Sequence, residues 1–500
     1  MRKVIVAAAT AAALGTLGLA ATAQAQATPR VTATTTAKNV VAGIPSSILI
    51  TNPGGTSEKC TVKVTGLPGA VTAGTSSSVK KGCEVELEGV WPSSGKKTVT
   101  ITFTASGKTT TDTLTANVLA EPCENDAVGV GSDTITPLTD QLSTDYNNTL
   151  AARSKCGKTT YYETWDAVNP VSGQIGDSIP EKADCPKIAR PDGSSAGITQ
   201  LGSFTKSSSG PFCTNFARSS RARASTDPPF AAGGVAFVNL AGDAVTWSHP
   251  AVNTVAPASL DPSQLTEIWS CTVPQANNGT AANQWGDLNP ALTGSAATTP
   301  ISPFLPQSGS GTLSFWETAI GVTTPGPCVS NATNTLEENE GINSVLNSPG
   351  AIFIYSVGDW IAQSDHAAAC TVKATCKANS SGVICKKIPG DDQFWCNITG
   401  KGTAQGAEVL GEISGTKPTT GSGKNTVINT AFPGTFDRTL FDVVPYDTAT
   451  TDHIPGATSP VGGVDLEKIF SSTGFDCGST AKTDIKNYGF VSLGTCGGTS

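Results

Sequence analysis

The sequence feature that most constrains the fold is a unit that recurs after residue 121. In this unit a short apolar stretch runs into a loop rich in glycine and serine, and a helical pattern follows most of these loops. The unit stands at residues 127–134, 188–198, 215–221 and 306–312. Strands that alternate with helices indicate an α/β sheet, and such sheets bind ligands at the carboxyl ends of their strands. The sequence therefore predicts an α/β fold in which the four loops converge on one small anion.

The loop at residues 306–312 shows why an anion is the expected ligand. Glycines allow the backbone to approach a ligand closely, and Ser308, Ser310 and Thr312 add hydroxyl donors. The stretch from Leu313 to Ile320 reads as a helix, whose first N–H groups and positive dipole end attract anions. The alternative is a turn that only caps this helix.

The N-terminus carries an export signal. Arg2 and Lys3 precede an apolar run over residues 4–21, and Ala23-Gln24-Ala25 provides a cleavage site of small residues. This pattern is typical of a secretory signal peptide, here residues 1–25. No later run is long and apolar enough to span a bilayer. We therefore expect a secreted or periplasmic protein without a membrane span.

The composition narrows the possible partners and cofactors. A net charge of −8 with only 14% charged residues makes nucleic acid and anionic membranes poor partners. Fourteen cysteines in an exported chain indicate disulfides, and the three distant histidines give no metal motif. We expect no metal, no cofactor and no catalytic residue. The expected pairs are Cys60–Cys83, Cys271–Cys328, Cys477–Cys496 and two among Cys123, Cys156, Cys185 and Cys213.

Residues 26–121 differ from the rest of the chain. Short alternating runs rich in Thr and Val are separated by turn signals such as Asn52-Pro53-Gly54-Gly55, which indicates a small all-β sandwich domain. Glu121-Pro122 marks its end. The expected role is a spacer or attachment module, with a glycan- or surface-binding module as the alternative.

The order and spacing of the loops resemble the phosphate-binding proteins of ABC importers, which belong to the type II periplasmic-binding-protein family. The resemblance covers residues 124–500. It is carried by the sequences Gly131-Ser132-Asp133-Thr134, Gly193-Ser194-Ser195-Ala196-Gly197, Phe216-Ala217-Arg218-Ser219-Ser220-Arg221 and Ser308-Gly309-Ser310-Gly311-Thr312, supported by stretches at 242–245, 261–269, 349–352 and 485–490.

The resemblance implies an α/β fold of two lobes that close on a ligand, preceded by the small β-sandwich. Lobe one would comprise residues 122–245 and 431–500, and lobe two residues 246–430. Two buried strands near 235–240 and 439–445 would cross between the lobes. A cysteine-rich insertion at about 366–403 would interrupt lobe two; its four cysteines allow three disulfide connectivities.

The resemblance also implies a set of ligand-binding residues. They are Asp133, Thr134, Ser194, Ser195, Arg218, Ser220, Arg221, Ser308, Ser310, Gly311 and Thr312.

Two positions depart from the family's phosphate site. Pro306 stands where the family has an arginine, and Ser220 where it has an aspartate. Arg218 or Arg221 could supply the cation instead, because a guanidinium fork suits an oxyanion. Asp133 could supply the acceptor for a protonated ligand. The alternatives are a solvated basic patch for the arginines and a helix-capping role for Asp133.

The resemblance implies a solute-binding protein, not an enzyme, that captures inorganic phosphate or a similar oxyanion. A monomer that delivers its ligand to an ABC permease is expected. The alternatives are a secreted surface or adhesion protein on the same fold, favoured by the extra sandwich, and a secreted phosphatase. The phosphatase is disfavoured because no base stands near a hydroxyl nucleophile in any sequence motif.

Overall fold

The structure is a computed structural model, and it describes residues 40–500 apart from a set of gaps. The expected signal peptide and most of the cysteine-rich segment lie outside the described residues. The gaps are residues 53–59, 69–70, 74–76, 80–81, 106–107, 152–154, 171, 173, 251–254, 275–282, 331–335, 339–340, 342–343, 371–384, 387–394, 397–407, 423–424 and 456–463.

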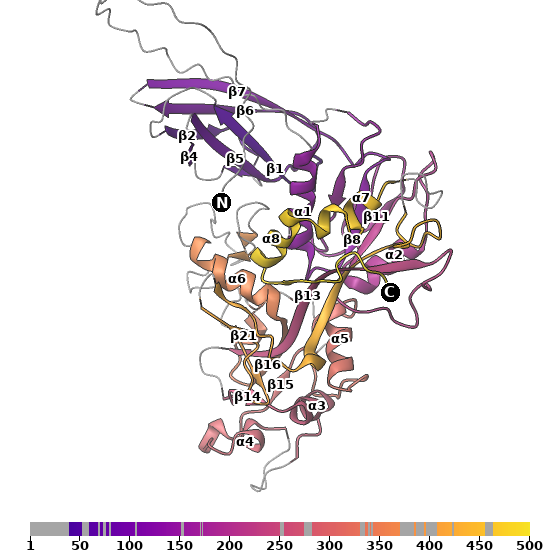
Figure 1. The fold of residues 1–500 in the computed structure, drawn as a ribbon. Helices are drawn as coiled ribbons and strands as arrows, with labels where there is room; N and C mark the ends of the chain where they lie inside the picture. The colour runs from indigo at the N-terminus through magenta and orange to yellow at the C-terminus, as the bar shows by residue number, and fades with distance from the viewer. Residues whose placement is uncertain are drawn as a thin grey trace, which may run out of the picture.

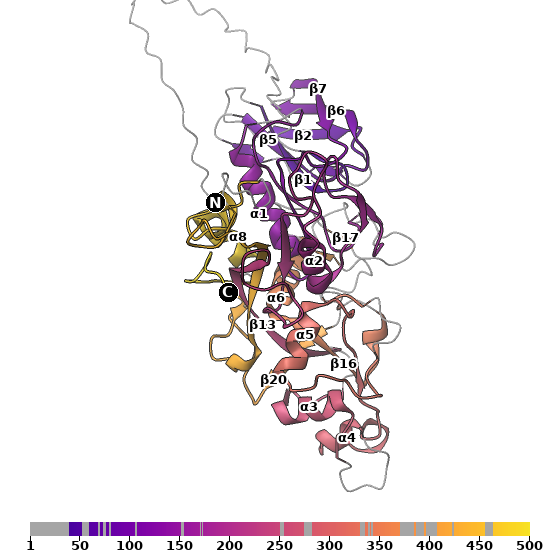
Figure 2. The same cartoon turned by 90° about the vertical axis from the view of Figure 1, so that its right-hand side faces the viewer.

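Seven described strands before residue 119 form two antiparallel sheets at one end of the molecule (Figures 1 and 2). Alternate residues of these strands point inward, so that Leu87 and Ile101 share a buried core with Trp91, which follows β5. The strands are β1 Pro45–Asn52, β2 Cys60–Thr65, β3 Val71–Ala73, β4 Ser77–Val79, β5 Gly82–Val90, β6 Gly95–Ala105 and β7 Lys108–Val118.

The segment that leads into these strands packs against the following part of the chain. Val41 and Ile44 share a buried cluster with Val130 and Trp165. The N-terminal strands therefore touch the α/β part through an apolar contact.

The α/β part is built on a mixed sheet, nine-stranded over the described residues, with the central order β15-β16-β13-β23-β12-β8-β9. β8, β9 and β12 run parallel, which confirms the α/β class expected from the sequence. The strands are β8 Ala127–Gly131, β9 Tyr162–Thr164, β12 Phe216–Ser219, β13 Val235–Pro250, β15 Ser302–Pro303, β16 Ala351–Ser356, β19 Glu408–Leu410, β23 Asp437–Pro445 and β24 Val491–Ser492.

The two long strands β13 and β23 hold the sheet together. They pair antiparallel from Val235 opposite Pro445 to Ala244 opposite Asp437, with an irregularity between Asn239 and Ala241. Both are buried along most of their length, as expected for apolar runs that are covered on both faces. The expected buried strands are confirmed; their role as crossings between two lobes stays a prediction.

The helices cover the sheet in two groups. Leu138 of α1 and Ile485 of α8 share one core, while Leu265 of α3, Trp316 of α5 and Ile361 of α6 share another. Figure 1 shows α1 and α8 beside the N-terminal half of β13, and α3 and α5 near its other end. The helices are α1 Thr136–Thr149, α2 Gly193–Gly202, α3 Pro262–Ser270, α4 Trp285–Leu288, α5 Gly311–Ala319, α6 Val357–Cys370, α7 Glu467–Phe470 and α8 Ser479–Asn487.

The strand expected before α2 does not belong to the large sheet. β11 pairs with β10 in a separate ladder, and only a bridge between Gly131 and Asp192 links the start of α2 to the large sheet. The strand before Gly193, β11, is only three residues long and begins with the charged Lys187. The small ladders are β10 Ser178–Pro180 with β11 Lys187–Ala189, β14 Ser259–Leu260 with β20 Glu412–Ile413, β17 Cys385–Lys386 with β18 Trp395–Cys396, and β21 Thr419–Thr420 with β22 Val427–Ile428.

Four disulfides connect described residues, and they confirm the expected pairings. They are Cys123–Cys156, Cys185–Cys213, Cys271–Cys328 and Cys477–Cys496. The side chains of Cys60, Cys83 and the four cysteines of the insertion lie outside the described residues. A helix long and apolar enough to cross a bilayer is not found among the residues that the structure describes.

We predict that the protein isolated from its natural source has no reactive thiol and begins near Gln26. An even cysteine count in an exported chain normally pairs off completely. Mass spectrometry after thiol labelling under denaturing, non-reducing conditions measures both properties. Labelling of two or more cysteines would contradict the prediction.

Candidate functional site

The loops predicted from the sequence meet at the centre of the α/β part. The hydroxyl of Ser132, after β8, donates to that of Ser220, after β12, at 3.1 Å. The Ser220 hydroxyl also lies 3.3 Å from that of Ser194, in the first turn of α2. Thr134 and Thr312, 178 residues apart, place their hydroxyl oxygens 3.2 Å from each other. These side chains are buried, so the structure forms an enclosed cluster of hydroxyl groups.

Glycine at position 311 allows this close approach. A Cβ atom there would lie 2.3 Å from the Ser194 Oγ and 2.4 Å from the Ser220 Oγ. Gly193 has a φ of +81°, and a Cβ there would lie 2.4 Å from the carbonyl oxygen of Gly309. The backbone N–H of Ser195 donates to that same carbonyl at 3.1 Å. The two glycine loops are therefore packed backbone to backbone.

Ser310 caps helix α5, as its position in the sequence predicted. Its Oγ accepts a hydrogen bond from the N–H of Leu313 at 3.0 Å. This bond leaves the hydroxyl proton free to be donated elsewhere. The N-terminus of the nine-residue helix α5 thus faces the hydroxyl cluster.

The acceptor for that proton is Glu338, which sequence reasoning missed. The hydroxyls of Ser310 and Thr134 donate to the two carboxylate oxygens of Glu338, one to each. The Glu338 side chain is fully buried. Its segment is fixed by Leu336, which packs in the core around α3 and α5 and whose carbonyl accepts from the N–H of Gln307 at 3.1 Å. No motif around Glu338 distinguishes it from other acidic residues of the chain.

Asp133 lies beside Glu338 and is buried, with 4% of its surface exposed. Neither of its carboxyl oxygens accepts a hydrogen bond from a described residue. Burial, and then the charges of Glu338 and Glu337, raise the pKa of Asp133 well above its ordinary value. The helix-capping alternative is not observed, because α1 receives only the backbone carbonyl of Asp133 and not its side chain.

The buried cation that borders the cluster is Arg438, a second residue that sequence reasoning missed. It comes from β23, and its Nη1 donates to the hydroxyl of Thr312 at 2.7 Å and to the carbonyl of Ser220 at 3.0 Å. Its Nη2 forms an ion pair with Asp243 of β13 at 2.8 Å. Asp243 also accepts from the N–H of Gly358 at 3.0 Å, at the start of α6. The only sequence signal for Arg438 was its position at the start of an apolar strand.

The two arginines proposed from the sequence have other partners. Arg218 is fully buried and donates to the carbonyls of Gly131, Ser132 and Trp165. Its guanidinium therefore stabilises the backbone of the loop that follows β8. Burial lowers its pKa to about 10. Arg221 pairs with Asp227 at 2.6 Å, in contrast to the solvated patch considered as an alternative.

The remaining predicted residues lie at the edge of the cluster. Ser195 is half-buried, and its Oγ accepts from the guanidinium of Arg221 at 3.3 and 3.4 Å. Ser308 is exposed at the tip of its loop. The structure thus brings Asp133, Thr134, Ser194, Ser220, Ser310, Gly311 and Thr312 together, and places Ser195, Ser308, Arg218 and Arg221 around them.

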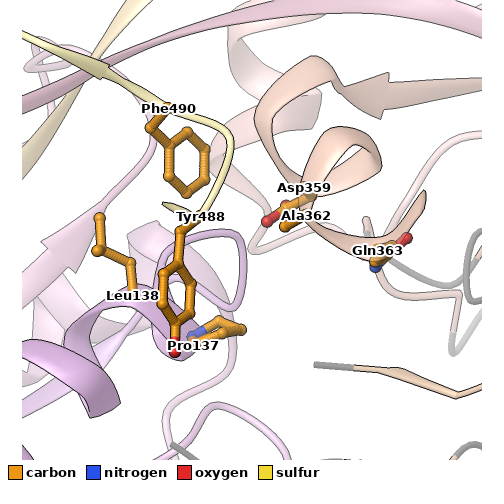
Figure 3. A pocket seen from close by; sticks show the side chains of 7 residues that line it. All are labelled: Pro137, Leu138, Asp359, Ala362, Gln363, Tyr488 and Phe490. Carbon is orange, nitrogen blue, oxygen red and sulfur yellow. The ribbon is translucent and has the colours of Figure 1, made fainter. Parts of the chain in front are cut away.

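A small pocket lies between α1 and α6, next to this cluster. It is lined by Pro137 and Leu138 of α1, by Asp359, Ala362 and Gln363 of α6, and by Tyr488 and Phe490. Figure 3 shows Asp359 and Ala362 on one side, facing Tyr488 and Phe490 on the other. Burial, and then the charge of Asp243, raise the pKa of Asp359 well above its ordinary value, although Arg438 opposes this shift. The pocket has no cation of its own among its lining residues.

Among the residues that the structure describes, there is no group of three or more His, Cys, Asp or Glu side chains that could hold a metal ion. At the cluster, hydroxyl groups donate hydrogen bonds to Glu338. Such donors suit an anionic or polar group.

A protein-family model matches the central part of the chain. A model of the PBP superfamily domain matches residues 166–401, a range that includes α2, β12, α5 and Glu338. No curated protein matches the chain. Domains of this superfamily are typically binding proteins without enzymatic activity. They are usually extracytoplasmic, and the disulfides of this chain are consistent with that location. The match supports a relation of this chain to the type II periplasmic-binding superfamily.

Proposed function

We propose that the protein is an extracytoplasmic solute-binding protein that captures phosphate or a related tetrahedral oxyanion between two lobes. The observation that carries this proposal is the pair of hydrogen bonds from Ser310 and Thr134 to Glu338. Hydroxyls from two loops far apart in the sequence already hold two oxygens of one anionic group. A solute with the same arrangement of oxygens could make the same contacts.

Further donors support the same proposal. The first N–H groups of α5 have no partner in the backbone ladder of the helix and carry its positive dipole end, although that of Leu313 donates to the Ser310 Oγ. Arg438 lies against Thr312, but its charge is matched by Asp243. Recognition would therefore rest on hydroxyl and N–H donors more than on an uncompensated cation.

Asp133 gives a reason to favour phosphate over sulfate. At a pH above its raised pKa, the Asp133 carboxylate repels an anion unless the anion donates a proton to it, and phosphate still carries a proton under these conditions whereas sulfate carries none. Two buried acceptor oxygens that face each other without a proton between them leave both without a hydrogen bond, which costs on the order of 1–3 kcal/mol. Isothermal titration calorimetry with phosphate, arsenate and sulfate on the purified protein tests the proposal. Absence of binding to all three would remove it and favour the surface-adhesion alternative.

We predict that Asp133→Asn relaxes the rejection of sulfate and weakens phosphate binding modestly. The amide can donate to an unprotonated oxygen, which the carboxylate cannot. Calorimetry with both anions measures the ratio of the two dissociation constants. An unchanged ratio would show that Asp133 does not contact the ligand.

The same substitution has an expected effect on stability. Because burial raises the pKa of Asp133, the protonated form contributes stability that is fully present below the ordinary pKa and is lost as the pH rises. The amide of the substituted side chain is neutral at every pH. The Asp133→Asn variant should therefore unfold at higher urea concentration than the unsubstituted protein at pH 7, and the difference should shrink below about pH 4.

A further inference from the structure

The contacts of Glu338 do not fit a purely structural role. Its carboxylate uses the same hydroxyls, Ser310 and Thr134, that the loop pattern marks as ligand-binding residues. Further acidic side chains lie close by, because the charges of Glu338 and Glu337 both act on the carboxyl group of Asp133. Hydroxyl donors therefore hold the Glu338 carboxylate beside other acidic side chains.

We propose that Glu338 is an internal ligand of the hydroxyl cluster, and that an external oxyanion binds only by exchanging with it. This inference rests on the proposed function and adds a competing group to it. Leu336 stays anchored in the core around α3 and α5, so only the Glu338 side chain has to leave. The exchange replaces one pair of anionic oxygens by another on the same two hydroxyls.

The exchange has a quantitative consequence for affinity. A tethered group competes at an effective concentration set by its linker, which lies in the millimolar range for short flexible links. The apparent dissociation constant of an external ligand rises in inverse proportion to the fraction of molecules whose site is open. If Glu338 occupies the site in about nine molecules of ten, its removal strengthens binding about tenfold.

The test compares the full chain with Glu338→Ala and Glu338→Gln. Phosphate titration by calorimetry measures affinity, and thermal unfolding with added acetate or phosphate measures occupancy of the vacated position. Glu267→Ala is the matched control, since it removes a carboxylate from α3, away from the hydroxyl cluster. Glu338→Gln keeps the side-chain volume in case the alanine variant does not fold.

The expected result is phosphate binding at least about tenfold tighter in Glu338→Ala than in the unsubstituted protein, with Glu267→Ala unchanged. Acetate should raise the unfolding temperature of Glu338→Ala alone, because it restores the missing carboxylate. Equal phosphate affinity in both proteins, without rescue by acetate, would overturn the inference and leave the proposed function standing. Rescue by acetate without any phosphate binding would support the internal ligand and overturn the phosphate proposal.

Discussion

Replacement of Arg438 by alanine is expected to lower the free energy of unfolding by about 3–5 kcal/mol. Arg438 and Asp243 form an ion pair at 2.8 Å, with 2% and 0% of their side-chain surfaces exposed. Removal of the guanidinium leaves the carboxylate of Asp243 buried without a cation, although the N–H of Gly358 and the hydroxyl of Ser356 still donate to it. Urea denaturation followed by circular dichroism measures the loss.

Two further variants separate the ion pair from general packing. Arg438→Lys keeps the charge but lacks the planar fork that reaches Asp243, Thr312 and the Ser220 carbonyl together, so an intermediate loss is expected. The double variant Arg438→Met with Asp243→Asn should recover part of the stability, because no unpaired charge is buried. A loss below about 1 kcal/mol in Arg438→Ala would show that water reaches Asp243 and that the pair is not desolvated.

The sequence predicted the hydroxyl cluster because each of its residues is tied to local structure. Ser310 stands where a helix N-cap belongs, and Gly311 and Gly193 stand where only glycine permits two backbones to touch. The apolar runs of β13 and β23 predicted buried strands from their composition alone. Local rules of this kind do not depend on which distant segment faces a residue.

The partners of the charged residues could not be predicted in the same way. Arg438 and Asp243 are 195 residues apart, and their pairing depends on the register of β13 with β23. Arg218 was expected to face a ligand, but its side chain turns to the carbonyls behind the first loop. Glu338 lies in a segment without a periodic pattern, so only the three-dimensional arrangement brings it to Ser310 and Thr134.

The charges of the acidic side chains at the hydroxyl cluster limit what the site can bind. A site that offers hydroxyl and N–H donors beside three acidic side chains, Asp133, Glu337 and Glu338, cannot hold an extra anion and all three charges together. One charge must be neutralised by a proton or must leave the site. Burial, and then the charges of Glu338 and Glu337, raise the pKa of Asp133 and favour its protonated form, which is the first route, and the proposed exchange of Glu338 is the second.

The Gly311→Ala substitution is expected to abolish anion binding while it lowers the free energy of unfolding by only about 1–3 kcal/mol, the usual cost of overpacking. The added methyl group would lie within 2.4 Å of the hydroxyl oxygens of Ser194 and Ser220. Those hydroxyls cannot simply rotate away, because the Ser194 Oγ accepts from the N–H of Ser220 at 3.0 Å and the Ser220 Oγ accepts from Ser132. Relief of the clash must separate α2 and α5, and this breaks the cluster.

Phosphate calorimetry and urea denaturation on the same Gly311→Ala protein measure the two effects. Gly157→Ala is the matched control, because a Cβ at that position meets no atom within 4 Å. It should change neither binding nor stability by more than about 0.5 kcal/mol, as is usual for surface substitutions. Full phosphate affinity in Gly311→Ala would contradict the assignment of the site, since a ligand held by Ser310, Thr312 and Ser194 must respond when the loops that carry them are forced apart.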